Sequence, residues 1–174
     1  MKAASIVTIR KELKHKSNEE LAELCLRLSR FKKENKELLT YLLFEADYEA
    51  GYIETIKTEI DEQFDQINTS SFFYIKKSVR KILRNTKKYI RYSLNKETEV
   101  ELLLYFCQKL NAMTPSISRN TTLTNLYDRN IIAIKKKVKN LHEDLQYDYS
   151  SESAWLEAIT EALKSLTARH KLSR

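Results

Sequence analysis

Eight basic side chains occupy one stretch of the chain, residues 72–94, and they are the residue types that bind anions. An advance of about 100° per residue, as in a helix, places all eight on one face roughly 140° wide. No acidic residue occurs between Asp65 and Glu97. Such a face can neutralise the phosphates of a nucleic acid. The candidate anion-binding residues are Lys76, Lys77, Arg80, Lys81, Arg84, Lys87, Lys88 and Arg91.

Aromatic and further basic residues extend this hypothesis. Tyr74 and Tyr92 fall at the edge of the basic face, where an unpaired base can stack. Four lysines near the end of a later helix would enlarge the patch: Lys135, Lys136, Lys137 and Lys139. The alternative is a solvated face that a neighbouring acidic helix, residues 52–67, compensates. From Glu45 to Asp65 there are eight acids and one base, Lys57. We expect the acidic helix to mask the basic face.

Catalytic chemistry has weaker candidates. His142 lies close in sequence to Glu143, Asp144 and Asp148, and a carboxylate beside a histidine can make it a general base. A solvated helix end explains the same residues. Glu12 and His15 have the Glu-x-x-His spacing of a di-iron site, but a second such pair is missing. The single glycine, Gly51, excludes a glycine-rich phosphate loop. The sequence therefore predicts no catalytic residue, no metal site, no cofactor and no enzyme.

The composition indicates one all-helical domain. The chain has 174 residues, 42% of them hydrophobic, with a net charge of +7, one glycine and one proline. Sheets and tight turns usually need more of both residues. Cys25 and Cys107 both lie in apolar helical runs and are predicted to be buried. Two cysteines give no disulfide framework, which favours a cytoplasmic protein. No apolar run approaches the roughly 20 residues of a membrane span.

Apolar spacing of the helical kind recurs along the whole chain. Ser17 and Glu20 form a capping box, Asn35 is a candidate helix cap, and Gly51 marks the turn after a helix that we expect to be central. On the 72–94 helix, the residues opposite the bases are predicted to be buried: Ile75, Val79, Ile82, Leu83, Tyr89 and Ile90. The expected helices are residues 5–15, 17–31, 35–48, 52–67, 72–94, 97–112, 121–145 and 154–168. This predicts a single all-α domain, residues 1–174, of seven or eight helices, either an antiparallel bundle or a short α–α superhelix.

Two segments of the chain echo each other. Residues 37–41, ELLTY, match residues 101–105, ELLLY, and each match lies between charged amphipathic helices. The hypothesis that follows is a duplication of a three-helix unit, residues 17–67 and 71–145, stacked as in superhelical proteins.

The order of these elements also resembles a known family. A basic helix, the run VELLLYF at residues 100–106, and a long helix opened by Tyr127 and closed by residues 142–144 follow one another. This order is similar to a family of bacterial helical proteins of similar length, known only as a domain of unknown function. The resemblance implies an all-helical fold and no defined activity, so it carries no functional residue to this chain.

Together these observations favour a non-catalytic, intracellular helical interaction module that binds a protein partner. The alternative is sequence-nonspecific binding of RNA or DNA through the basic face of the 72–94 helix. The third hypothesis is a hydrolase or metal enzyme around His142. A membrane partner is not expected, because the apolar side of the basic helix is needed for the core. The sequence names neither the protein partner nor the oligomeric state.

Overall fold

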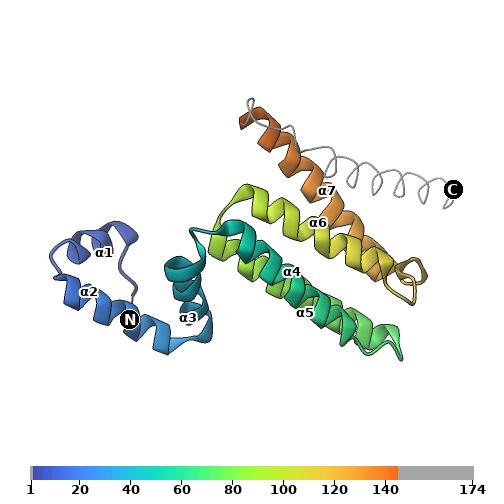
Figure 1. Cartoon of the computed structure of the whole chain (residues 1–174), viewed down its shortest axis with the longest axis horizontal. Coiled ribbons are helices and arrows are strands. Elements are labelled where there is room, and N and C mark those ends of the chain that lie inside the picture. The colour runs from blue at the N-terminus through green and yellow to red at the C-terminus, as the bar shows by residue number, and fades with distance from the viewer. Residues whose placement is uncertain (1, 145–174) are drawn as a thin grey trace. The chain divides into compact units, whose positions relative to one another are not determined.

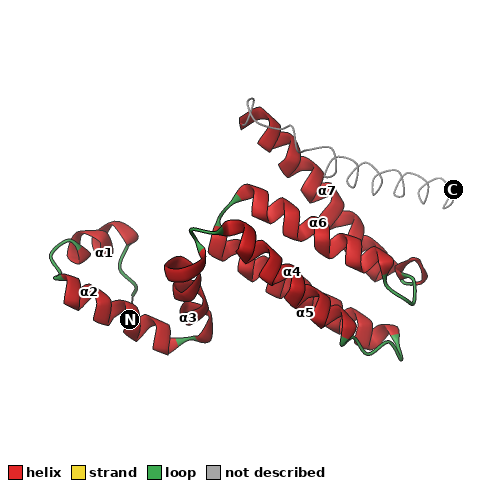
Figure 2. Ribbon diagram, in the orientation of Figure 1, coloured by secondary structure: helices red, strands yellow, loops and turns green. Residues whose placement is uncertain are grey.

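The computed structural model describes residues 2–144, and for residues 139, 140 and 142–144 it describes the backbone alone. These residues form seven α-helices, one π-helical turn and one 3-10 turn, with no strand in this part of the chain (Figure 2). The all-α prediction is confirmed. Two compact units make up the chain, Met1–Asp47 and Tyr48–Arg174, which we describe separately. The predicted helix at 154–168 lies outside the described residues.

Up to residue 144, the second unit is an antiparallel bundle of four helices (Figure 1). Short connections return the chain after each helix, and α6 packs against the other three. The single 3-10 turn, η2 (Ile117–Arg119), lies in the break between α6 and α7. The helices are α4 (Glu49–Asp65), α5 (Phe72–Ser93), α6 (Lys96–Ala112) and α7 (Thr121–Asp144). The predicted antiparallel packing is therefore observed in this unit.

The core of the bundle lies around α6. Phe106 is fully buried, and its ring lies 5.7 Å from that of Phe64 on α4. Cys107 is buried as predicted, and burial raises the pKa of its thiol to about 12. Seven apolar side chains of this one helix are buried: Val100, Leu102, Leu103, Leu104, Phe106, Cys107 and Leu110. A helix that is apolar on so many sides must have neighbours on each of them.

The apolar side of α5 packs onto this core. Four of its six predicted positions are buried, Ile75, Val79, Ile82 and Ile90, while Leu83 and Tyr89 are half-buried. The helix ends at Ser93, and the next residue, Leu94, has a φ of 57°, in the left-handed region that glycine usually occupies. The side chain of Leu94 is 83% exposed. Burial of the Leu94 side chain therefore does not offset the unfavourable backbone conformation of this residue.

The first unit consists of short helices. They are α1 (Ile6–Leu13), α2 (Asn18–Phe31), α3 (Lys33–Thr40) and a π-helical turn, η1 (Tyr41–Glu45). The predicted capping box is confirmed: the Glu20 amide donates to Ser17 Oγ at 3.2 Å, and the Ser17 amide donates to Glu20 Oε2 at 2.9 Å. Asn35 is not an N-cap. Its side-chain amide donates to the Leu28 carbonyl at 2.9 Å, so it caps the end of α2 instead.

Besides the Asn35 cap, three predictions for residues 25–51 were wrong. The 35–48 segment is not central, because Leu42, Leu43 and Phe44 are 56%, 62% and 77% exposed. Cys25 is exposed rather than buried. The physical reason is that α2 and α3 pack mainly on each other, and a two-helix hairpin covers only one side of each helix. Gly51 lies within the first turn of α4, which begins at Glu49, and a Cβ there would meet the Tyr48 ring at 2.4 Å.

The boundary between the two units, after Asp47, falls inside the first of the two predicted repeats, residues 17–67. The helices of that repeat are thus divided between the units. The duplication, and the single domain of residues 1–174, remain predictions.

Candidate nucleic-acid interface

The structure places the eight basic residues of α5 along one open face. Six of the side chains are exposed, and Lys76 and Lys88 are half-buried. From residue 76 to residue 91 the helix rises roughly 22 Å, at about 1.5 Å per residue. The exposed six are Lys77, Arg80, Lys81, Arg84, Lys87 and Arg91. This face can therefore contact several phosphates of one strand.

Seven of the eight cations on this face lack charge compensation from the described part of the chain. The ammonium of Lys88 lies 4.4 Å from the centre of the Tyr89 ring. The other seven cations form neither an ion pair nor a hydrogen bond with a described residue. Several are like-charged neighbours four residues apart, as at Lys77 and Lys81, and each such pair destabilises a helix by about 0.2–0.5 kcal/mol. An anionic partner would relieve this repulsion.

The expectation that the acidic helix masks the basic face was wrong. α4 does pack against α5, and two uncharged groups of α5 hydrogen-bond to it at the edge of the face. Tyr89 Oη donates to Glu59 Oε1 at 2.9 Å, and the Asn85 amide donates to Gln63 Oε1 at 3.1 Å. The edge of α5 that meets α4 thus presents a phenol and an amide rather than its lysines and arginines.

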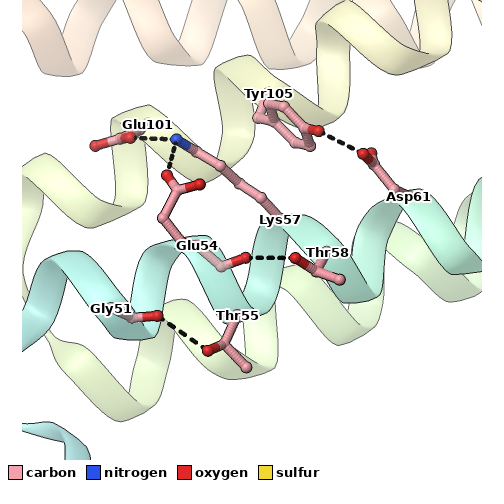
Figure 3. A network of polar contacts seen from close by, with 8 residues as sticks. All are labelled: Gly51, Glu54, Thr55, Lys57, Thr58, Asp61, Glu101 and Tyr105. Carbon is pink, nitrogen blue, oxygen red and sulfur yellow. Dashed lines mark hydrogen bonds and ion pairs between the residues drawn. The ribbon is translucent and has the colours of Figure 1, made fainter.

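Other acids of α4 turn to α6 instead (Figure 3). Asp61 accepts a hydrogen bond from Tyr105 Oη at 2.7 Å and pairs with Lys109 at 2.9 Å. Burial alone would raise the pKa of Asp61, but the hydrogen bonds from Lys109 and Tyr105 outweigh it and lower that pKa. Asp61 is therefore held as a carboxylate by α6, away from the cations of α5.

A basic basin, here called the α5 basin, lies on the first half of the open face and encloses about 490 Å³. Five cations and one aromatic ring line it, and the ring, that of Phe73, lies at its first end and is 67% exposed. The Tyr74 ring supports it edge-on at 5.4 Å. Its lining residues are Phe73, Lys76, Lys77, Arg80, Lys81 and Arg84. An exposed ring among cations is the arrangement that holds a single-stranded base between its flanking phosphates.

A second depression, the α5–α7 groove, encloses about 420 Å³ between the two helices. Arg80 and Lys87 line it from α5, and Arg129 lines it from α7. Thr122 and Asn125 add a hydroxyl and an amide, and no acidic side chain lines it. Arg80 lines both depressions, so one strand passing from the basin into the groove would contact it on the way.

The sequence identified the cations but not all of their neighbours. Tyr92 is buried, at 9% exposure, and cannot stack on a base, whereas Tyr74 is 47% exposed. Lys137 pairs with Glu99 on α6 at 2.7 Å and does not extend the patch. Lys135 and Lys136 are exposed, and the side chain of Lys139 lies outside the described residues.

Two residues of the candidate interface, Phe73 and Arg129, were missed. A signal existed for Phe73, because at about 100° per residue it falls in the middle of the basic face. Tyr92 falls at the edge, which α4 covers. Arg129 carries no comparable signal, since only the folding of α7 against α5 brings it to the groove.

The other chemical hypotheses gain no support from the described residues. The side chains of His142, Glu143, Asp144 and Asp148 lie outside them, so the hydrolase or metal hypothesis remains a prediction. Glu12 and His15 are both exposed. Among the side chains that the structure describes, no group of three His, Cys, Asp or Glu residues could hold a metal ion. None of the described helices is long and apolar enough to cross a membrane.

Comparisons with known proteins leave the site to be interpreted from its geometry. No protein-family model, curated protein or solved structure matches the chain. The resemblance to the bacterial helical family therefore remains a prediction.

Proposed function

We propose that the protein binds single-stranded RNA or DNA along α5, without base-sequence specificity and without catalysis. The observation that carries this proposal is that seven cations share one face and pair with no described residue. Contacts to phosphates fix the position of a strand but read no sequence. The cations would hold the phosphates, and Arg80 would join the α5 basin to the α5–α7 groove.

Phe73 supports a single strand over a duplex. Its exposed ring lies at the end of a row of five cations, and only an unpaired base offers its flat face for stacking. Base–aromatic stacking contributes about 1–3 kcal/mol per base and tolerates any base. A duplex would use the same cations but leave the ring unused.

The test is a titration of one labelled oligonucleotide, single-stranded and as a duplex, followed by fluorescence anisotropy at physiological salt. We expect the parent protein to bind the single strand more tightly. Phe73→Ala should weaken single-strand binding by about 5- to 150-fold and leave duplex binding nearly unchanged. Ile132→Ala is the matched control, because Ile132 is 62% exposed on α7 and lines neither depression. An absence of binding to either form would contradict the proposal, and a Phe73→Ala protein that binds like the parent would contradict the stacking role.

A second role, as a protein-interaction module in the cytoplasm, is supported by the first unit. Within its described residues only one side chain, Tyr41, is buried, while large apolar residues are exposed on α1, α2 and the η1 turn. Soluble proteins rarely leave contiguous apolar surface uncovered unless a partner binds there. Chemical footprinting of the exposed apolar residues, with and without candidate partners, tests this role.

A further inference from the structure

Exposed and half-buried apolar residues of the first unit surround one groove, and they lie on α2, α3 and the π-helical turn η1. A groove of about 290 Å³ separates these helices, with apolar residues on both walls: Cys25, Leu28, Leu38, Leu39 and Leu42. Beside it on α2, Leu24, Leu28 and Phe31 are 39%, 60% and 77% exposed. These three residues recur at helical spacing, so they form one stripe along the helix.

A charged flank borders this stripe on the side away from the groove. A depression of about 390 Å³ lies there, lined by Lys16, Glu20, Glu23, Leu24, Arg27 and Arg30. Along the helix, the acids Glu20 and Glu23 precede the bases Arg27 and Arg30. Lys16 pairs with Glu20 at 2.8 Å, so Glu23 supplies the net negative charge of the first half of the flank. Arg27 and Arg30 make the second half positive, and Leu24 lies between the two halves.

We infer that this surface binds a second copy of the chain, with the two α2 helices packed antiparallel. In that orientation the negative half of each flank faces the positive half of its partner, whereas a parallel pair would place like charges together. The stripe of Leu24, Leu28 and Phe31 would meet its own copy, as a twofold interface requires. This inference rests on the interaction role proposed for the first unit.

The charge of the first unit and the scattered apolar residues of the second unit both favour a second copy of the chain over other occupants. Up to Asp47 the chain has ten basic and eight acidic residues, so two such units repel each other little. The second unit offers no matching apolar surface in its described part. Its exposed large apolar residues are scattered over the ends and sides of different helices: Tyr48, Phe73, Tyr74, Leu94 and Ile132.

The first measurement is sedimentation equilibrium of the full chain over a range of concentrations. The parent protein should dimerise, and Leu24→Gln with Leu28→Gln should raise the dissociation constant by at least about tenfold. Leu26→Gln is the matched control: Leu26 is 41% exposed, like Leu24, but points to the other side of α2. Its dissociation constant should equal that of the parent.

Charge exchange tests the orientation. Glu23→Arg alone and Arg27→Glu alone should each weaken the dimer, because each places like charges across the interface. The two changes together restore opposite signs and should recover most of the affinity. An apolar surface that binds its copy without a fixed orientation would not show this recovery.

Cys25 provides an independent probe, because it lies near the middle of α2 and hence near the twofold axis. A short bis-maleimide should link two chains through Cys25, and Cys25→Ser should abolish the link. Cys107 is buried with a raised pKa and should not react in the folded protein. If the protein is a monomer and Cys25 reacts, the proposed dimer is wrong, but the surface remains open to another protein partner. If the protein is a monomer and Cys25 does not react, both the dimer and the interaction role are wrong, since the chain itself would then cover the surface.

Discussion

The lysines between α4 and α6 and the cations of α5 lie in one small bundle but in opposite electrostatic settings. Lys57 lies between Glu54 and Glu101, at 2.7 Å from each (Figure 3). Lys109 pairs with Asp61, and Lys137 pairs with Glu99. On α5, seven cations pair with no described residue. The total charge of a helix therefore says little about its partners, because the facing helix decides which charges are compensated.

Proton affinities show the same contrast. Burial alone would lower the pKa of Lys57, but Glu101 and Glu54 outweigh it and raise that pKa. Its ammonium is thus fixed as part of the α4–α6 contact. Seven of the α5 cations, all except Lys88, form no ion pair with a described residue, so their side chains are available to a polyanion. One set of cations serves the fold, and we propose that the other serves binding.

The largest effect on stability is expected from a change in the core, which positions both the paired lysines and the α5 cations. Leu104 on α6 is 6% exposed, and α6 contributes one member of each ion pair between helices named above as well as the packing surface of α5. Leu104→Ala should lower the free energy of unfolding by about 2–5 kcal/mol. Denaturant unfolding followed by circular dichroism measures this change. A decrease below about half a kcal/mol would show that α6 is not central.

Two triple variants should separate the two sets of cations. Changing Lys57, Lys109 and Lys137 to Gln should destabilise the protein, by about 0–1 kcal/mol for each ion pair removed. Changing Arg80, Lys81 and Arg84 to Gln should leave stability unchanged or raise it by about 0.2–0.5 kcal/mol for each like-charge pair relieved. Thermal melting of both variants at low salt measures the difference. Equal destabilisation by both would show that the α5 cations are compensated after all.

Acid titration should reveal a smaller effect at Asp61. Its pKa is lowered from the usual 3.8 by folding, so its stabilising contribution is complete above that value and is lost as the pH falls through the lowered pKa. The free energy of unfolding should therefore fall below about pH 4, and less steeply in Asp61→Asn. Glu62→Gln, which changes an exposed acid of the same helix, is the control and should follow the parent curve. Identical slopes in all three proteins would exclude Asp61 as a contributor.

The sequence predicted the helices well because their apolar spacing is a local property. The two sides of α5, and the burial of Cys107 and Leu104, follow from that spacing. It could not predict which neighbour each charged face would meet. We expected the acids of α4 to face the cations of α5. Instead, Asp61 and Lys57 of α4 pair with residues of α6. Which helix they face depends on the rotation of the three helices about their axes.

The same limit explains the errors at Cys25, Leu42 and Tyr92. A leucine-rich pattern shows that a face is apolar, but not whether enough chain lies nearby to cover it, and α2 and α3 leave much of theirs exposed. Tyr92 lies on the border of the basic face, where α4 decides its burial. Arg129 reaches the α5–α7 groove only through the packing of α7, which no local pattern encodes.

The central claim, that the α5 cations are open to a polyanion, is tested most directly by the salt dependence of single-strand binding. Each cation removed from a phosphate should make the slope of log K against log salt shallower by about 0.7 on a single strand. The slope of the Arg80, Lys81 and Arg84 variant should become shallower by up to about 2, and the Lys57, Lys109 and Lys137 variant should keep the parent slope. Both variants change the net charge by three, so a general charge effect would change both slopes equally. Equal slopes for the two variants, or a parent protein without salt-dependent binding, would contradict the account.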